Sequence, residues 1–174
     1  MVKYGIIADT HINANDDPNK VKTLIDQLKE IFKDVDEIIH AGDICDEDFL
    51  KRLKEIAPTK CVTGNMDYID DLEDFIKFSA GSYNIGVIHE LPENLEAFFK
   101  EHGLHILITG HTHQTITQGT KYNTLILNPG SPTSPKAPPP KRGFLKPVAR
   151  PTVITMKIDE DTDIISTYTI NLKI

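Results

Sequence analysis

Residues 37–43 read EIIHAGD, and together with residues 4–11, YGIIADTH, they decide the fold. Each stretch passes from a few apolar residues directly into polar ones, as a buried strand does where it ends. Residues 60–67, KCVTGNMD, repeat the pattern. We therefore predict three strands, over residues 4–8, 37–40 and 60–63.

Two amphipathic segments separate these strands. Residues 18–34 and 46–57 carry apolar side chains three and four positions apart, which predicts a helix over each. Asp16 and Asp17 suit the start of the first helix, because a side-chain oxygen there can accept from free backbone N–H groups. The alternation of strand and helix predicts a parallel sheet with helices packed on it.

The second half of the chain is richer in strands. We predict strands over 74–79, 83–89, 105–109, 124–127, 152–158 and 164–171, and a helix over 92–102 that Gly103 caps. The expected fold class is α/β, a mixed β-sandwich of two sheets flanked by helices. The 174 residues suit a single domain that spans 1–174.

The composition excludes several classes of protein. Lys and Arg number 19 against 26 Asp and Glu, a net charge of -7, which argues against a dedicated nucleic-acid coat protein. With 39% hydrophobic residues the chain is not disordered throughout. No apolar run approaches the ~18 residues of a membrane span, and the N-terminus lacks a signal-peptide pattern. Cys45 and Cys61 fit reduced thiols, so we expect a cytoplasmic protein without membrane contact.

Residues 129–151 differ from the rest of the chain. They hold eight of the 11 prolines and five Lys and Arg, and they have no acidic residue. This composition predicts a surface loop, extended or disordered. The loop is either a solvated insertion or a basic flap that attracts an anionic substrate, and a docking strand for a partner is a third interpretation.

Five short polar clusters each follow a predicted strand, where ligand sites of α/β sheets lie. Their candidate ligands are four imidazoles, two carboxylates and one amide, from Asp9, His11, Asp43, Asn65, His89, His111 and His113. Any one cluster alone could be an ordinary turn or a packed histidine. Seven ligands suit two metal ions roughly 3.5–4 Å apart with one carboxylate between them. The lack of thiolate ligands argues against structural zinc, and the N/O mixture suits manganese, with nickel, cobalt, iron or zinc as alternatives.

The order of these clusters, D-x-H, G-D, G-N-x-D, H and G-H-x-H, resembles the calcineurin-like metallophosphoesterase superfamily, in particular its small single-domain prokaryotic and archaeal phosphodiesterases. The resemblance runs from Tyr4 to about Ser131. It implies the calcineurin-like fold and a division of the ligands between two divalent ions. One ion would take Asp9, His11 and His113, the other Asn65, His89 and His111, and Asp43 would bridge both.

The resemblance also implies an activity. A hydroxide that bridges the two metals would attack phosphorus, with Asp43, Asn65 and His111 as catalytic residues and a small phosphodiester as substrate. A phosphomonoesterase, and a nuclease that uses the basic loop, are the alternatives among enzymes. A protein-binding scaffold like the small subunit of the eukaryotic retromer coat is the alternative of another class, but the intact ligand set favours an enzyme. Binding of nucleic acid and association into a homo-oligomer stay open.

Two positions depart from the family pattern. Met66 replaces a histidine and cannot donate a proton, so we expect weak activity on esters with poor leaving groups. Glu90 replaces a glycine, and its side chain either crowds the site, adds negative charge or points away. We expect Asp67 to orient Asn65 or a neighbouring loop. His40 reads as a packed strand histidine or as an outer partner of the site.

Overall fold

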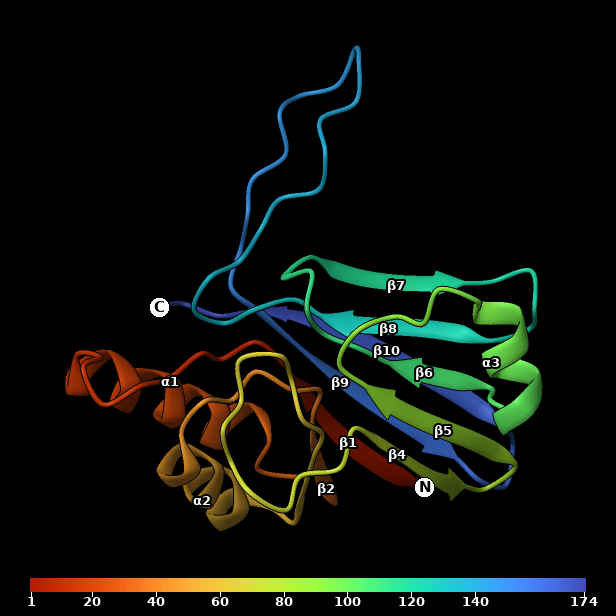
Figure 1. The fold of residues 1–174 in the computed structure, drawn as a ribbon, viewed down its shortest axis with the longest axis horizontal. Coiled ribbons are helices and arrows are strands. Elements are labelled where there is room, and N and C mark those ends of the chain that lie inside the picture. Colours follow the sequence, from red (N-terminus) through yellow and green to blue (C-terminus); the bar gives the residue numbers. More distant parts are fainter.

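Two five-stranded sheets face each other in the computed structural model, which describes residues 1–174 (Figure 1). The first sheet has the order β10 (Ile164–Asn171), β9 (Thr152–Asp159), β1 (Val2–Ile7), β2 (Glu37–His40) and β3 (Thr59–Cys61). The second has the order β4 (Phe75–Ala80), β5 (Tyr83–Ile88), β6 (Ile106–Ile108), β8 (Leu125–Pro129) and β7 (Thr115–Gly119). The predicted mixed sandwich is confirmed.

The strands that precede the polar clusters are parallel within each sheet. In the first sheet β1, β2 and β3 run parallel, and Ile7 at the end of β1 pairs with His40 at the end of β2. In the second sheet β5, β6 and β8 run parallel. The residues that follow these strands therefore leave each sheet at one edge.

The apolar residues of β1 point alternately to two cores. Ile6 is fully buried between the two sheets, and Ile7 is fully buried on the other face, where helices cover the first sheet. This alternation follows from the two-residue period of a strand. Burying a side chain of this size contributes roughly 1.5–3 kcal/mol, so both faces of the strand hold it in place.

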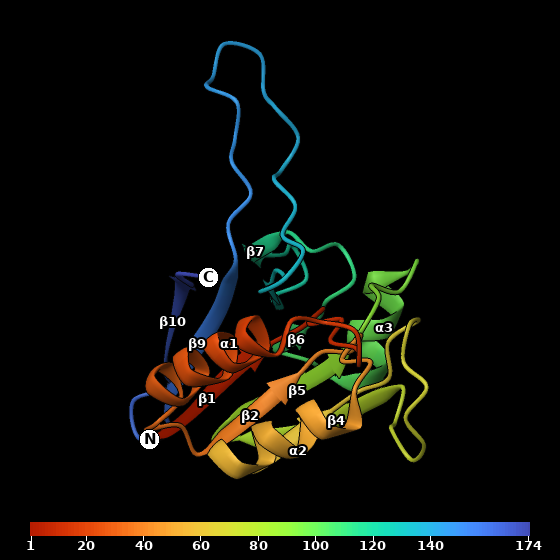
Figure 2. The same cartoon turned by 90° about the vertical axis from the view of Figure 1, so that its left-hand side faces the viewer.

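Three helices complete the layers (Figure 2). Helices α1 (Pro18–Ile31) and α2 (Glu47–Ile56) pack on the outer face of the first sheet, and α3 (Leu95–His102) packs on the second. Each begins at a side-chain cap, from Asp17, Asp46 and Asn94, and Gly103 ends α3 in the left-handed region at φ 59°. No helix is long and apolar enough to cross a membrane.

The structure corrects the predictions in detail. Strand β7 (Thr115–Gly119) was not predicted, because it is an edge strand with a single apolar side chain, on Ile116, and shows no buried alternation. Helix α1 ends at Ile31 rather than at residue 34, and α3 begins at Leu95 rather than at residue 92. Asn94 caps α3 by accepting from the N–H of Ala97, so the preceding residues lie outside the helix.

The proline-rich segment between β8 and β9 contains no helix or strand. Its first residues stay on the body, since the Ser131 hydroxyl donates to the carbonyl of Asp9 at 2.7 Å and the Lys136 N–H donates to the carbonyl of His113 at 3.0 Å. Residues 137–150, called the arm below, then run out from the body in both views (Figures 1 and 2).

Candidate metal centre

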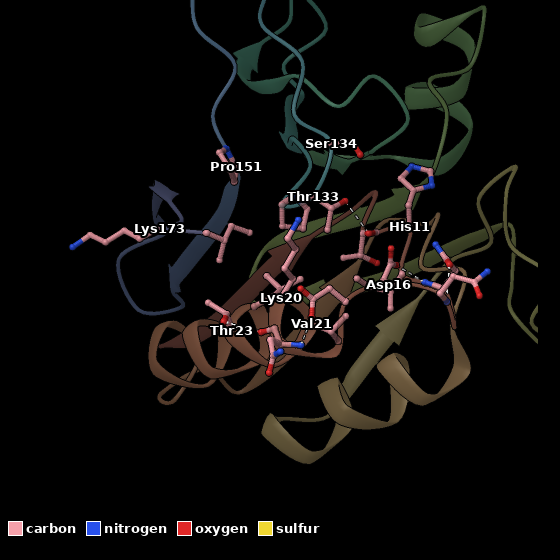
Figure 3. A pocket seen from close by; sticks show the side chains of 18 residues that line it. His11, Asp16, Lys20, Val21, Thr23, Thr133, Ser134, Pro151 and Lys173 are labelled. Atoms are coloured by element: carbon pink, nitrogen blue, oxygen red, sulfur yellow. Dashed lines mark hydrogen bonds between the residues drawn. The ribbon is translucent and has the colours of Figure 1, made fainter.

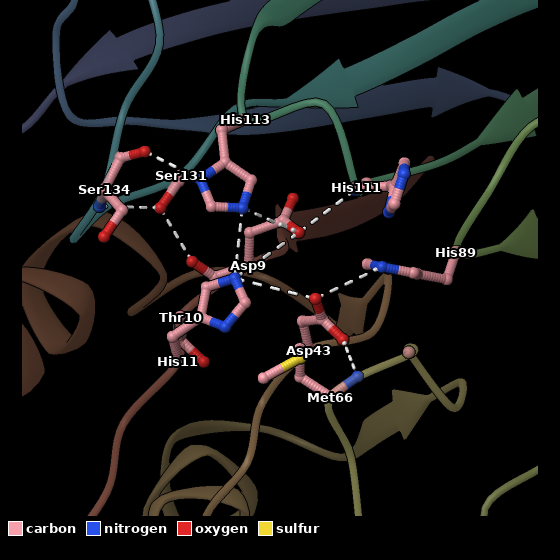
Figure 4. Close-up of polar contacts among 12 residues, drawn as sticks. Asp9, Thr10, His11, Asp43, Met66, His89, His111, His113, Ser131 and Ser134 are labelled. Carbon is pink, nitrogen blue, oxygen red and sulfur yellow. Dashed lines mark hydrogen bonds and ion pairs between the residues drawn. The ribbon is translucent and has the colours of Figure 1, made fainter.

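All seven predicted ligands gather where the parallel strands end (Figure 4). Asp9 and His11 follow β1, Asp43 follows β2, and Asn65 follows β3. From the second sheet, His89 follows β5, and His111 and His113 follow β6. The two sheets thus contribute to one site from opposite sides.

One half of the site holds Asp9, His11 and His113. The Nε2 atoms of the two histidines are 3.0 Å apart. The Oδ1 atom of Asp9 lies 3.6 Å from Nε2 of His113 and 3.9 Å from Nε2 of His11. These three residues offer atoms that are close enough together to hold one cation.

The other half holds Asn65, His89 and His111. The Oδ1 atom of Asn65 lies 3.1 Å from Nε2 of His89 and 3.1 Å from Nδ1 of His111. Asp43 links the two halves, because its Oδ2 atom is 3.4 Å from Nε2 of His89 and 3.6 Å from Nε2 of His11. Asp9, Asp43 and His89 also form a group that could hold a cation.

Backbone carbonyls fix the tautomers of two of these histidines. The Nδ1–H of His89 donates to the carbonyl of Ala41 at 2.8 Å, and the Nδ1–H of His113 donates to that of Ser134 at 2.7 Å. In a neutral ring the Nε2 atom then carries a lone pair. Nε2 of His89 faces the oxygens of Asn65 and Asp43, and Nε2 of His113 faces Asp9 and Nε2 of His11, so several atoms with lone pairs converge here. Such a set of atoms attracts a cation.

Asp9 shows most directly that a cation fits. Its side chain is fully buried, and Oδ2 has no hydrogen-bond partner. Burial, with a smaller contribution from Asp43, raises the pKa of Asp9 to about 7, although the N–H of His111 donates to Oδ1 at 3.0 Å. A buried carboxylate oxygen without a hydrogen-bond partner is costly unless a positive charge satisfies it.

The backbone of the site is strained. Five of the seven candidate ligands have φ values in the left-handed region: Asp9 (51°), His11 (46°), Asp43 (57°), His111 (67°) and His113 (59°). Non-glycine residues enter this region rarely, at a cost on the order of 1–3 kcal/mol each. Such strain persists only where the surroundings enforce it, and it is typical of functional sites. No pattern in the sequence indicated it.

Glycines next to the ligands allow the loops to pack closely. A Cβ on Gly64 would lie 2.2 Å from both the backbone N and Oδ1 of Asp43. A Cβ on Gly42, whose φ is 86°, would lie 2.6 Å from Nδ1 of His89. The Gly-Asp and Gly-Asn pairs of the sequence therefore have a steric reason beyond turn formation.

Asp67 orients the loop that carries Asp43. Its Oδ2 accepts from the N–H groups of Asp43 (2.9 Å) and Gly64 (2.8 Å), and its Oδ1 accepts from that of Cys45 (2.7 Å). No hydrogen bond joins the Asp67 side chain to Asn65, so of the two predicted roles the structure shows the contact with a neighbouring loop.

The contacts of His40 agree with both interpretations, a packed strand histidine and an outer partner of the site. It is fully buried, and its Nε2 lies 3.1 Å from the hydroxyl of Thr10, between Asp9 and His11. Burial lowers the pKa of His40 to about 3, so the ring is neutral. Because the Thr10 hydroxyl donates to the carbonyl of Ile44 at 3.4 Å, His40 is the donor to Thr10. The ring thereby links the β1 loop to the core.

Other residues that support the site were not predicted. The Ser131 hydroxyl, the Ser134 carbonyl and the Asn128 amide, which donates to the carbonyl of Gly110 at 2.7 Å, all hold ligand loops. For Asn128 and Ser131 the only signal was the family resemblance, which extends to about Ser131.

Met66 and Glu90, the two positions that depart from the family pattern, lie at the rim of the site. Met66 is 47% exposed, and its N–H donates to Oδ1 of Asp43 at 2.8 Å. The Glu90 side chain is largely exposed, with Oε1 3.7 Å from Nε2 of His111. Glu90 therefore adds negative charge at the rim and does not fill the site.

A large cavity borders the site on the side of His11 (Figure 3). Its volume is about 890 Å³, and it lies between the start of α1 and the beginning of the proline-rich segment. His11, Lys20 and Ser134 are among the residues that line it. A substituent that extends from a group bound at the metal centre has room here.

The comparisons with known proteins agree with this arrangement. Residues 2–150 match the calcineurin-like phosphoesterase superfamily domain. A probable metallophosphoesterase of Methanothermobacter thermautotrophicus is 34% identical, with 94% of this chain and 91% of the relative covered. The probable metallophosphoesterase MJ0623 of Methanocaldococcus jannaschii is 38% identical over 77% of this chain and 70% of its own length. The chain belongs to the calcineurin-like phosphoesterase superfamily.

Solved structures share the fold at low identity. Vps29 of Entamoeba histolytica in complex with Zn²⁺ superposes with a TM-score of 0.72 at 20% identity, over 98% of this chain and 99% of that one. A structure described as a novel archaeal phosphodiesterase superposes with a TM-score of 0.65 at 21% identity, over 97% of this chain and all of that one. Vps29 and the archaeal phosphodiesterase thus share the fold of this chain.

Proposed function

We propose that this metallophosphoesterase is a phosphodiesterase that works with two divalent metal ions. The observation that carries the proposal is the position of Asp43. Its Oδ2 atom lies within 3.6 Å of His11 and within 3.4 Å of His89, so one carboxylate oxygen faces both halves of the ligand set. One half would be Asp9, His11 and His113, and the other Asn65, His89 and His111, with manganese as the first candidate and nickel, cobalt, iron or zinc as alternatives.

The residues of the chain would then hold the metal ions and position the phosphoryl group. Two divalent ions, when bound, supply activation of water and neutralisation of charge on a phosphoryl group. Asp9 and Asp43 would bind them through their carboxylates, and the carbonyls of Ala41 and Ser134 would keep His89 and His113 in the tautomer that binds. The Asn65 amide and His111 would lie next to the phosphoryl oxygens and stabilise their negative charge.

The charge at the rim favours a diester over a monoester. Glu90 places a carboxylate beside His111, and Met66 offers neither a positive charge nor a proton. A phosphomonoester dianion would meet this negative charge, whereas a diester carries one charge fewer. The cavity beside His11 also gives room for the second substituent that a diester has.

The lack of a proton donor at position 66 predicts a preference among diesters. General acid catalysis typically contributes roughly 10²–10⁴ in rate, mostly where the leaving group is a poor one. Diesters with an acidic leaving group, such as aryl esters, should therefore be the better substrates. A Met66→His substitution should extend turnover toward alkyl diesters.

The test is metal-dependent hydrolysis by the stripped protein. The protein is treated with chelator, and Mn²⁺, Ni²⁺, Co²⁺, Zn²⁺ or Mg²⁺ is added in turn with an aryl phosphodiester or the matching monoester. We expect metal-restored hydrolysis of the diester, faster than that of the monoester and lost in Asn65→Ala. A Glu90→Gln variant should raise monoester turnover relative to diester turnover. Faster monoester turnover by the unaltered chain would contradict the diester preference. Tight binding of two ions without any turnover would favour the scaffold function instead.

A further inference from the structure

The arm has no partner within its own molecule. The N–H of Phe144 donates to the carbonyl of Lys141 at 3.1 Å, and this turn is the only hydrogen bond that residues 137–150 make. Gly143, the third residue of this turn, occupies the left-handed region at φ 84°, which glycine enters without the steric cost of a Cβ. Phe144, Leu145 and Val148 are 77%, 95% and 71% exposed. Bulky apolar side chains in water at the tip of a long excursion indicate a surface that binds something.

The charge of the arm is uniform and unpaired. It carries Lys141, Arg142, Lys146 and Arg150, no acidic residue, and no ion pair. Since five of the 19 Lys and Arg lie in residues 129–151, the rest of the chain has 14 against 26 Asp and Glu. The arm is therefore complementary in charge to the body that carries it.

One exposed segment of the body is complementary to the arm, because it carries the opposite charge and an exposed aromatic side chain. Residues 67–74, DYIDDLED, called the acidic loop below, contain five acidic residues and no basic one. Asp67 points inward to the metal centre, whereas the other four acidic side chains, Asp70, Asp71, Glu73 and Asp74, are exposed and form no ion pair. Tyr68 is 91% exposed. The acidic loop thus offers negative charge around an exposed aromatic ring.

The two segments do not meet within one molecule. In both views the arm rises from one side of the body, and the acidic loop, in yellow between α2 and β4, lies toward the other (Figures 1 and 2). Between Lys136 and Gly143 the chain extends by at most roughly 25 Å, and its direction is outward. The prolines stiffen it, so little conformational entropy is lost when it docks.

We propose that the arm of one copy of this chain binds the acidic loop of a second copy. Each copy has one arm and one acidic loop, so two reciprocal contacts related by a two-fold axis satisfy both, as in an isologous dimer. A nucleic acid or an anionic membrane would attract the arm but would be repelled by the acidic body, whereas the acidic loop supplies both the charge and the apolar contact. Because the acidic loop follows directly after Asn65 and Met66, a bound arm brings positive charge to the rim of the metal centre.

The test is a charge swap read by sedimentation equilibrium at about 50 µM and at physiological ionic strength. An arm variant carries Lys141→Glu, Arg142→Glu, Lys146→Glu and Arg150→Glu. A loop variant carries Asp70→Lys, Asp71→Lys, Glu73→Lys and Asp74→Lys. We expect the unaltered chain to be a dimer that dissociates in ~1 M salt, each variant alone to be a monomer, and an equal mixture of the two to form a heterodimer.

A matched control separates this contact from a general effect of charge. Lys20→Glu, Lys29→Glu, Lys54→Glu and Lys157→Glu change the net charge as the arm variant does, at exposed positions without ion pairs, and should leave the dimer intact. Thermal midpoints identify any variant that has not folded. A monomeric unaltered chain, a dimer of either variant alone or a mixture that stays monomeric overturns the proposal. Arm-dependent binding of an oligonucleotide or of anionic vesicles by a monomeric chain overturns it as well, and assigns the arm to that ligand.

Discussion

The candidate metal centre and the arm are the most and the least constrained regions of this molecule. At the metal centre, hydrogen bonds and packing hold five candidate ligands in the left-handed region, and added Cβ atoms would collide with the backbone of Asp43 or the ring of His89. In the arm one hydrogen bond joins residues 137–150, and a Cβ on Gly143 would meet nothing within 4 Å. Many contacts of the fold hold the backbone of the candidate metal centre in one conformation. Almost none constrain the backbone of the arm.

The difference shows where this fold concentrates its stability. Two sheets that bury both faces supply enough contacts to hold a strained, acceptor-rich site at their shared edge. The arm adds nothing to that core, so its sequence is available for contacts outside the molecule. Substitutions in the two regions should therefore differ in kind as well as in size.

Loss of the shared carboxylate should have the largest effect. Asp43→Asn keeps the shape of the side chain but removes the charge that faces both halves of the ligand set. We expect diesterase activity to fall by more than the roughly 10–100-fold that follows the removal of a residue that only orients a metal ligand. Steady-state kinetics at saturating Mn²⁺ measure it, with the exposed, unpaired Asp34→Asn as control. Equal activity of the two variants would show that Asp43 is not a ligand.

The second-largest effect should come from Asp67, whose side chain is not one of the candidate metal ligands. Asp67→Asn replaces one of two accepting oxygens by a donor that would face the N–H groups of Asp43 and Gly64 or that of Cys45. Metal affinity should fall by roughly 10–100-fold, as titration calorimetry measures. Asp70→Asn, at an exposed side chain of the same segment, should bind metal as the unaltered chain does.

A pair of glycine substitutions compares the two regions directly. Gly64→Ala places a Cβ 2.2 Å from the backbone N of Asp43, so the loop must shift. We expect the free energy of unfolding to fall by about 1–3 kcal/mol. Gly143→Ala also requires an unfavourable φ, but the arm is free to adopt another turn, so the change should stay below about 0.5 kcal/mol. Urea unfolding measures both, and a larger loss for Gly143→Ala would mean that the arm is part of the folded core.

His40 should make the stability dependent on pH. Its pKa is lowered to about 3 by burial, so the folded protein binds fewer protons than the unfolded chain between that value and about 6.5. The free energy of unfolding should therefore fall as pH drops through this window, by about 2 kcal/mol at pH 5 from His40 alone. Urea midpoints at pH 7.5 and pH 5 should differ less in His40→Gln than in the unaltered chain. Equal differences in the two proteins would show that His40 is not held neutral.

The smallest effect should come from the tip of the arm. Leu145 is 95% exposed, whereas Leu107 is fully buried beneath α3. Leu107→Ala should cost about 2–5 kcal/mol and Leu145→Ala less than about 0.5 kcal/mol in the monomeric protein at low concentration. Thermal unfolding compares the two, and a cost above 1 kcal/mol for Leu145→Ala would place the tip against the body.

The sequence predicted which candidate ligands lie together at one edge better than it predicted the details of the fold, for physical reasons. Residues such as Asp9 and His113 could be selected because their chemistry is visible in the residue type and because parallel strands end at one edge. Their left-handed backbone could not be predicted, since it is enforced by tertiary contacts rather than by neighbours in the chain. For the same reason the carbonyl partner of His113, on Ser134, was not predicted.

Elements without a buried face were the hardest to predict. Strand β7 is exposed along almost its whole length, so no alternation marks it. The basic loop was recognised by composition, but its outward path depends on the absence of contacts, which residue types do not encode. The acidic loop is visible in the sequence as a run of acidic residues, but the residue types do not encode that four of their side chains are exposed without ion pairs.

If one chain binds two metal ions through a shared carboxylate, the number of bound ions shows it. The stripped protein is titrated with Mn²⁺, bound metal is measured by elemental analysis, and hydrolysis of an aryl phosphodiester is followed in the same samples. We expect two ions per chain, activity that rises with occupancy of the second ion, and fewer than two ions in Asp43→Asn. One ion per chain with full activity, or two ions that Asp43→Asn also retains, would contradict it.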